Sequence, residues 1–254
     1  MGKKNKQPRF TKSDRMELIS QRRSAMPVLK TRASPKQLLE TLLTFNDVQR
    51  EAVRQIGFGN ILNLNVKNIP SALSYYLVDV FDVASMSLIL NDGRHSLRIT
   101  DIDVNDTLGI PLGDKDVICD VYGAKNSEEH DAWRVQFAEI FITTKVLTRR
   151  MKEQVEGGDD FKRNFMILFI TTMIESGTDN LVNQSCFQSI VDVSSIADYN
   201  WCQLVIQKLE SSKRDWVFQS KESRYFCGPI TFLLVSSYFN MYYKIVLLFI
   251  QYRL

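Results

Sequence analysis

The side chains most able to do chemistry in this 254-residue chain are four cysteines and two histidines. No Cys-x-x-Cys pair occurs and the histidines lie far apart, so there is no signature of a tetrahedral zinc site. Cys227 precedes Gly228, an order found around some cysteine-protease nucleophiles, but such a nucleophile needs a positioned base and neither histidine lies in a recognisable motif. We therefore interpret Cys227 as structural. The six side chains are Cys119, Cys186, Cys202, Cys227, His95 and His130.

A run of carboxylates between residues 101 and 120 is the second candidate. Asp101-x-Asp103-x-Asn105 matches the first three ligand positions of a calcium-binding EF-hand loop. The match then fails, because Asp106 stands at the glycine position and Leu112 at the position of the bidentate glutamate. We interpret the motif as a charged helix start. No spacing selects the trio of a two-metal nuclease from the whole set of Asp101, Asp103, Asp114, Asp116 and Asp120.

Gly57-Phe58-Gly59 is the one glycine pair that could suggest a phosphate cradle. It lacks the third glycine of a dinucleotide fingerprint and the Gly-Lys-Ser/Thr of a P-loop. It also follows a helical pattern rather than a strand, so we interpret it as a turn that ends a helix. No cofactor and no metal are predicted from these motifs.

The net charge of +3 conceals a strongly uneven distribution of charged residues. Residues 1–32 hold ten basic and two acidic side chains and carry +8, whereas the remainder carries −5. The basic segment has no sustained apolar period, which predicts a disordered arm. Such an arm suits nuclear import, contact with nucleic-acid phosphates, an anionic lipid surface or simple solvation. Its candidate import or phosphate contacts are Lys3, Lys4, Lys6, Arg22 and Arg23.

Signals for the secretory pathway are weak. No apolar stretch follows Met1, and Lys6 stands where a myristoylation motif wants Ser or Thr. We therefore expect the four cysteines to be reduced thiols.

Helical periodicity dominates the rest of the chain. We expect helices over residues 34–56, from Pro70 to about Phe81, within 127–156, from Asp159 onward, over 184–191, over 198–217 and from Pro229 onward. Residues 61–66 alternate in part and suggest a short strand or an extended lead-in.

One hairpin interrupts this helical pattern. Asp92-Gly93 between two apolar runs predicts strands at 86–90 and 96–99. Thr100 and Asp103 resemble a capping box that starts a short helix, which Gly109 and Pro111 would end. The predicted class is mainly α, a helical domain with one small β-hairpin, preceded by the disordered basic arm.

The most apolar window, residues 230–250, is long enough to span a bilayer. Asn240 and Lys244 interrupt it, and a central lysine costs about 2.5–3.5 kcal/mol on insertion scales. We therefore favour a buried terminal helix over a membrane anchor.

Six motif blocks follow one another between about residues 50 and 238. The most specific is Leu97-x-Ile99-Thr100-x-x-Asp103-Val104-x-x-x-Leu108-Gly109-Ile110-Pro111. The others are Gly57 to Leu64 with Ile69-Pro70, Tyr76 to Asp82, Phe161 to Phe165, Asn200-Trp201-Cys202 and Tyr225 to Ile230. Together they resemble the plant mobile domain, also called the aminotransferase-like plant mobile domain.

This resemblance implies a transposon-related domain of plant nuclear proteins that is associated with transposon silencing, genome stability and meristem maintenance. It also implies protein partners, among them a phosphatase-like protein, because some relatives are fused to a phosphatase or to a ubiquitin-like-protein-specific protease domain. Aminotransferase activity is not predicted, since no Schiff-base lysine or phosphate-binding cup is recognisable. The protease signature around Cys227 is missing too.

We therefore expect residues 1–33 to form the basic arm and residues 34–254 one helical domain, truncated at its C-terminus relative to the family. The expected function is a non-catalytic protein-interaction domain in the nucleus, with the cytoplasm as the alternative location. Three alternative functions stay open: a DNA- or chromatin-binding module that uses residues 1–32, an inactive remnant of a transposon-encoded protease or nuclease, and a tail-anchored membrane protein.

Overall fold

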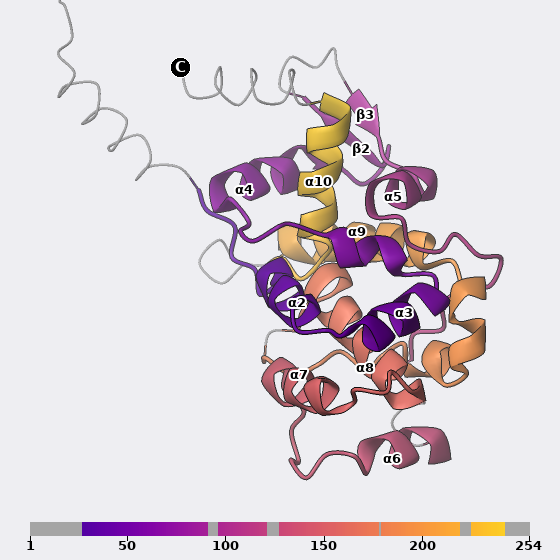
Figure 1. Cartoon of the computed structure of the whole chain (residues 1–254). Helices are drawn as coiled ribbons and strands as arrows, with labels where there is room; N and C mark the ends of the chain where they lie inside the picture. The colour runs from indigo at the N-terminus through magenta and orange to yellow at the C-terminus, as the bar shows by residue number, and fades with distance from the viewer. Residues whose placement is uncertain (1–26, 91–95, 121–126, 178, 219–224, 242–254) are drawn as a thin grey trace, which may run out of the picture.

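The computed structural model describes residues 27–90, 96–120, 127–177, 179–218 and 225–241 (Figure 1). Helices make up most of this part of the chain, and a small antiparallel sheet lies at one end, so the predicted mainly α class is confirmed. The predicted arm residues Lys3, Lys4, Lys6, Arg22 and Arg23 lie outside the described residues.

The first helical stretch is two helices, α2 (Pro35–Leu42) and α3 (Asp47–Gln55), so the prediction of one helix over 34–56 was wrong. The chain breaks at Asn46 because this residue begins the second helix with a capping box. Its side chain accepts the Gln49 amide at 2.8 Å, and the Gln49 side chain accepts the Asn46 amide at 3.0 Å.

A 3-10 helix, η1 (Gly59–Asn63), replaces the strand that alternation suggested for residues 61–66. Gly57 turns the chain with a φ of +85°, which ends the preceding helix as predicted. The turn directs Phe58 and Ile61 into the interior, where both are buried. The three-residue spacing of these two buried side chains matches one turn of a 3-10 helix, which brings both onto the same side.

The sheet follows α4 (Ser71–Val80) and has the strand order β1-β2-β3, with β1 (Phe81–Asp82), β2 (Ser87–Ile89) and β3 (Ser96–Arg98). The predicted hairpin is confirmed, with Leu88 opposite Leu97. The helix predicted to run to Phe81 ends one residue earlier, because Phe81 pairs with Leu88 as an extra edge strand. Residues 91–95, which hold the predicted turn, lie outside the described residues.

Helix α5 (Asp101–Leu108) begins and ends at the predicted caps. The Asp103 carboxylate accepts the Thr100 amide at 2.8 Å, and the Thr100 hydroxyl accepts the Asp103 amide in return. Gly109 ends the helix in the left-handed conformation with φ +59°. The first two carboxylates of the calcium-like motif therefore lie in the first turn of a helix, and Asp103 acts as its cap.

The second half of the chain is again helical and includes one π-helical turn. Two separate helices occupy the predicted 127–156 region, and the turn that follows α8 is a π-helix. The elements are α6 (Glu128–Arg134), α7 (Thr144–Glu153), α8 (Asp159–Phe169), η3 (Ile170–Ile174), η4 (Phe187–Ile190), η5 (Val193–Asp198), α9 (Trp201–Phe218) and α10 (Ile230–Met241).

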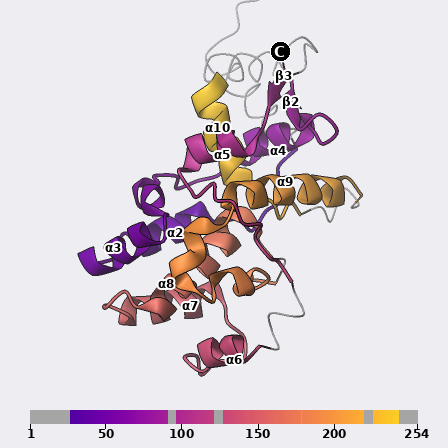
Figure 2. The ribbon, with the colours of Figure 1, turned by 90° about the vertical axis from the view of Figure 1, so that its right-hand side faces the viewer.

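The core is built around α8, which is surrounded by other elements (Figures 1 and 2). Phe58 contacts the rings of Phe165, Phe169 and Trp201 edge-on, with centroids 6.0, 5.1 and 5.9 Å away. All four side chains are fully buried. We call Phe58, Phe165, Phe169 and Trp201 the aromatic core. Buried aromatic side chains contribute through both their area and their edge-to-face geometry.

The first turns of helix α10 are packed into the helical domain. Ile230, Phe232, Leu233 and Leu234 are buried, and the helix packs against α4, α5 and η3, so a core position for its first turns is confirmed. No helix within the described ranges combines the length and the apolar composition needed to cross a bilayer. Residues 242–254 lie outside the described residues.

Candidate functional site

A polar cleft of about 820 Å³ opens between the loop after α6, the segments that follow η3 and helix α9. Charged, amide, hydroxyl and sulfur-bearing side chains line it together with the apolar side chains of Ile140, Phe141, Ile142, Leu181 and Val182. Its chemistry-bearing side chains are Cys119, His130, Arg134, Glu175, Asp179, Asn183, Ser185, Lys208, Asp215 and Cys227. We call this region the disulfide cleft.

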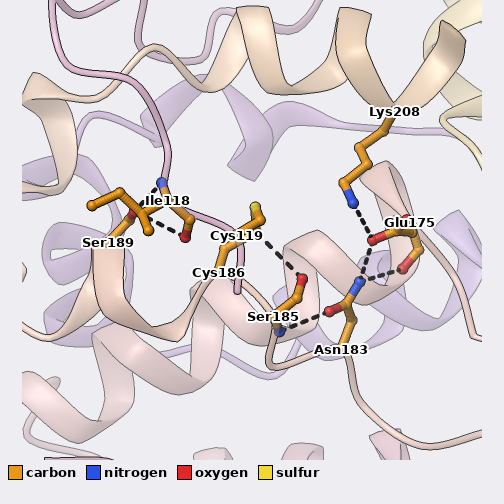
Figure 3. Close-up of a disulfide and its surroundings, with 8 residues drawn as sticks. All are labelled: Ile118, Cys119, Glu175, Asn183, Ser185, Cys186, Ser189 and Lys208. Carbon is orange, nitrogen blue, oxygen red and sulfur yellow. Dashed lines mark hydrogen bonds and ion pairs between the residues drawn. A yellow bond between two sulfur atoms is a disulfide. The ribbon is translucent and has the colours of Figure 1, made fainter. Parts of the chain in front are cut away.

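Cys119 and Cys186 form a disulfide at one wall of the cleft (Figure 3), so the expectation that all cysteines are reduced was wrong for this pair. Two backbone contacts bring them together. The Asp120 amide donates to the Ser185 carbonyl at 2.9 Å, and the Ile118 amide donates to the Ser189 hydroxyl at 2.8 Å. The extended segment 118–120 is thereby held against η4.

A chain of polar contacts leads from α9 to the disulfide (Figure 3). Lys208 Nζ lies 2.8 Å from Glu175 Oε2, and the Asn183 side-chain amide donates to the same oxygen at 2.8 Å. Asn183 Oδ1 accepts the Ser185 amide at 2.9 Å, and Ser185 Oγ lies 3.6 Å from Cys186 Sγ. The Glu175–Lys208 ion pair is mostly shielded from water, at 28% and 21% side-chain exposure.

The π-helical turn η3 determines where Glu175 lies. The Glu175 amide donates to the Ile170 carbonyl five residues earlier, at 2.9 Å, and the chain then becomes extended. The Thr171 hydroxyl accepts the Asn183 amide at 2.8 Å, which fixes the returning segment beside Glu175. π-helical turns of this kind occur frequently at functional sites.

His130 lies at the edge of the cleft, and its ring contacts aromatic side chains and an amide. Its ring is buried against Trp133 and Phe187, and Nε2 lies 2.8 Å from Gln184 Oε1. His95 lies outside the described residues. The structure thus gives His130 a packing role between two aromatic side chains.

The two unpaired thiols have environments that oppose ionisation. Burial raises the pKa of Cys202 to about 12, and its Sγ lies 3.4 Å from the Ile110 carbonyl oxygen. Burial, together with the carboxylates of Glu175 and Asp215, raises the pKa of Cys227. A nucleophilic cysteine works as a thiolate, which both surroundings disfavour.

The acidic residues singled out in the sequence do not converge. Asp103 caps α5, and within the described ranges no three His, Cys, Asp or Glu side chains lie close enough together to hold a metal ion.

The segment that leads out of the predicted basic arm is attached to the body. Leu29 is buried, and its amide donates to the Ser71 carbonyl at 3.1 Å. Arg32 donates to Asn180 Oδ1 at 2.5 Å and lies over the Tyr225 ring. The chain therefore joins the folded body from Leu29 onward.

The structure defines a helical domain with a small antiparallel sheet and a disulfide at a polar cleft. The chain belongs to the family described as "Domain of unknown function (DUF8566)", whose model matches residues 31–234. No curated protein matches the chain, and no solved structure matches it either. The resemblance to the plant mobile domain stays a prediction.

Sequence reasoning did not identify Glu175, Asn183, Ser185 or Lys208 as residues of a site. Nothing in their local spacing indicates that they meet, since α9 brings Lys208 to Glu175 only in the folded chain. An even number of cysteines was the one signal for the disulfide, and the expectation of reduced thiols argued against it.

Proposed function

We propose that this chain is a non-catalytic protein-interaction domain of a transposon-derived plant nuclear protein, acting in transposon silencing or genome stability. The transposon-related setting is supported by the six motif blocks and their order. The interaction role is supported by one structural observation, an exposed apolar loop beside the disulfide cleft.

The exposed loop lies between α6 and α7. Val135, Ile140 and Phe141 are 83%, 84% and 67% exposed. We call these three residues the apolar lip. Ile140 and Phe141 also line the cleft, so the apolar lip is continuous with a concave polar surface. Exposed apolar side chains at the rim of a polar concavity are typical of protein contact sites.

Polar contacts join this loop to α6 and α7. The Arg134 guanidinium donates to the carbonyls of Phe137 and Ile140 at 3.0 Å each, and also to that of Glu139. Arg149 of α7 pairs with the Glu139 side chain. A loop fixed before binding loses less conformational entropy when a partner contacts it, which favours affinity.

The charges of the cleft indicate what the partner should present. Lys208 balances Glu175, and Arg134 is engaged with backbone carbonyls, whereas the Asp179 and Asp215 side chains lie on exposed residues at the rim. The surface therefore suits a protein segment that places an apolar side chain on the lip and a basic side chain near the rim carboxylates.

The test compares the full chain with Phe141→Ser in binding to nuclear protein partners. Partners retained by the wild-type chain are purified and titrated by calorimetry. We expect Phe141→Ser to weaken binding by about tenfold or more, as for a central apolar contact. Leu43→Ser is the matched control, since Leu43 is 69% exposed but lies outside the cleft lining.

Equal affinities for the three proteins would reject the apolar lip as the interface. Binding to duplex DNA that falls steeply with salt and disappears when residues 1–28, which precede the buried Leu29, are removed would instead favour the DNA-binding alternative.

A further inference from the structure

The two cysteines of the disulfide differ in how far they are exposed. Cys186 is 1% exposed and packs within the core, whereas Cys119 is half-buried and lines the cleft. A small molecule that enters the cleft therefore meets the Cys119 side of the bond. Attack on a disulfide requires access to one sulfur, and the other sulfur leaves.

We propose that the Cys119–Cys186 disulfide is a thiol-exchange site for a small monothiol of the glutathione type that enters through the cleft. The proposal goes beyond the interaction role and does not depend on it. The site would make the wall of the cleft sensitive to the redox state of the surrounding thiol pool.

The reaction has two steps. The thiolate of the first monothiol forms a bond to Cys119 Sγ, the Cys119–Cys186 bond breaks, and Cys186 leaves as a thiolate. A second monothiol then attacks the sulfur of the first monothiol in the mixed disulfide, and Cys119 leaves as a thiolate. The protein disulfide gains two electrons, the two monothiols are oxidised to their disulfide, and their two protons end on Cys119 and Cys186.

Ser185 is placed to assist the departure of Cys186. Its hydroxyl lies 3.6 Å from Cys186 Sγ and can donate a hydrogen bond to the leaving thiolate. The backbone of Ser185 is held by Asn183, which in turn donates to Glu175. Ser185 is therefore a positioning residue for the leaving sulfur.

Reduction would loosen a limited part of the cleft wall. Residue 115 stays attached without the disulfide, because the Lys115 amide donates to the Asp198 carbonyl and its carbonyl accepts the Asn200 amide. At residues 118–120 the contacts that remain include the hydrogen bonds of Ile118 and Asp120. The expected opening is thus local to the segment that carries Cys119.

The decisive experiment traps the mixed disulfide in the full chain. Cys186→Ser leaves Cys119 as a free thiol that attacks oxidised glutathione, which is the second step run in reverse, and Cys119→Ser leaves Cys186 as the matched control. Each folded variant is incubated with oxidised glutathione, and peptide mass mapping locates the glutathionyl group. We expect Cys119 to be modified at least tenfold faster than Cys186, because Cys186 is 1% exposed.

The wild-type chain provides a second measurement that does not require a variant to fold. Reduced glutathione is added without denaturant, and differential alkylation follows the release of both thiols. We expect release faster than global unfolding measured by hydrogen exchange, and Ser185→Ala should slow it roughly two- to tenfold.

Three results would overturn the proposal. One is modification of Cys186 as fast as that of Cys119. Another is reduction that proceeds only at the rate of global unfolding. The third is a chain purified without reductant in which both cysteines are already free to alkylate.

Discussion

The aromatic core and the disulfide cleft are built on the same helix and differ in almost every physical respect. Helix α8 contributes Phe165 and Phe169 to the core, and the π-turn that extends it delivers Glu175 to the cleft. The aromatic core is fully buried, and the Trp201 indole N–H donates to the Ile196 carbonyl at 2.8 Å. The cleft is open to solvent and linked by ion pairs, amides and sulfur.

This difference shows what the family-like motif blocks encode. Phe58, Phe165 and Trp201 all fall within blocks, as do the cap residues of α5. Cys119, Glu175, Asn183, Ser185, Cys186 and Lys208 fall between them. The blocks therefore hold residues of the core and the helix caps, whereas the chemistry-bearing residues of the cleft, apart from Cys227, lie in the intervening segments. A resemblance that rests on the blocks therefore supports an inference about the fold and gives little information about the residues of the cleft.

The largest expected effect comes from breaking the aromatic core. Phe58→Ala removes a fully buried ring that contacts three others, and we expect the free energy of unfolding to fall by about 3–5 kcal/mol. Urea unfolding followed by tryptophan fluorescence measures it. Phe58→Leu, which keeps most of the volume, should cost about 1–2 kcal/mol. Equal losses for both variants would contradict the account based on buried volume, because Phe58→Leu also removes the edge-to-face ring contacts.

The fold was predictable wherever the signal was local. Thr100, Asp103 and Gly109 act within one helix, so their residue types alone identify its two ends. The break between α2 and α3 was missed because the apolar period continues across it, and the capping role of Asn46 competes with that period. Strand β1 was missed because two residues are too short to show alternation.

The cleft was unpredictable for a different reason. Cys119 and Cys186 are 67 residues apart, and Glu175 meets Lys208 through the packing of α9 near the end of η3. These are tertiary contacts between segments whose own sequences look like ordinary loops and helix surfaces. Spacing within a segment carries no information about which distant segment will lie beside it.

The next largest effect is expected at the disulfide. Replacing both cysteines, Cys119→Ala with Cys186→Ala, frees a 67-residue loop in the unfolded chain. We expect a loss of about 2–4 kcal/mol relative to the oxidised protein, mainly from unfolded-state entropy. Urea unfolding without reductant measures it, and wild-type protein in reductant should match the variant. An unchanged midpoint in both cases would show that the bond contributes nothing to stability.

A smaller effect is expected at the shielded ion pair of the cleft. A double-mutant cycle with Glu175→Gln and Lys208→Met should give a coupling energy of about 1 kcal/mol, because the pair is close and largely removed from water. Salt up to 1 M should reduce the coupling only in part, since buried pairs are screened less. A coupling of zero would mean that Asn183 alone satisfies Glu175.

The smallest effect is expected at an exposed pair of similar geometry. Lys115 Nζ lies 2.9 Å from Asp198 Oδ2, but the two side chains are 54% and 55% exposed. The cycle with Lys115→Met and Asp198→Asn should give a coupling that urea unfolding cannot distinguish from zero, because water screens both charges. The two pairs share charge type and near-identical distance, so a difference between them isolates the effect of shielding. If the exposed pair coupled as strongly as Glu175 with Lys208, the polar environment of the cleft would have no special energetic role, and its hydrogen-bonded chain would be an ordinary surface network.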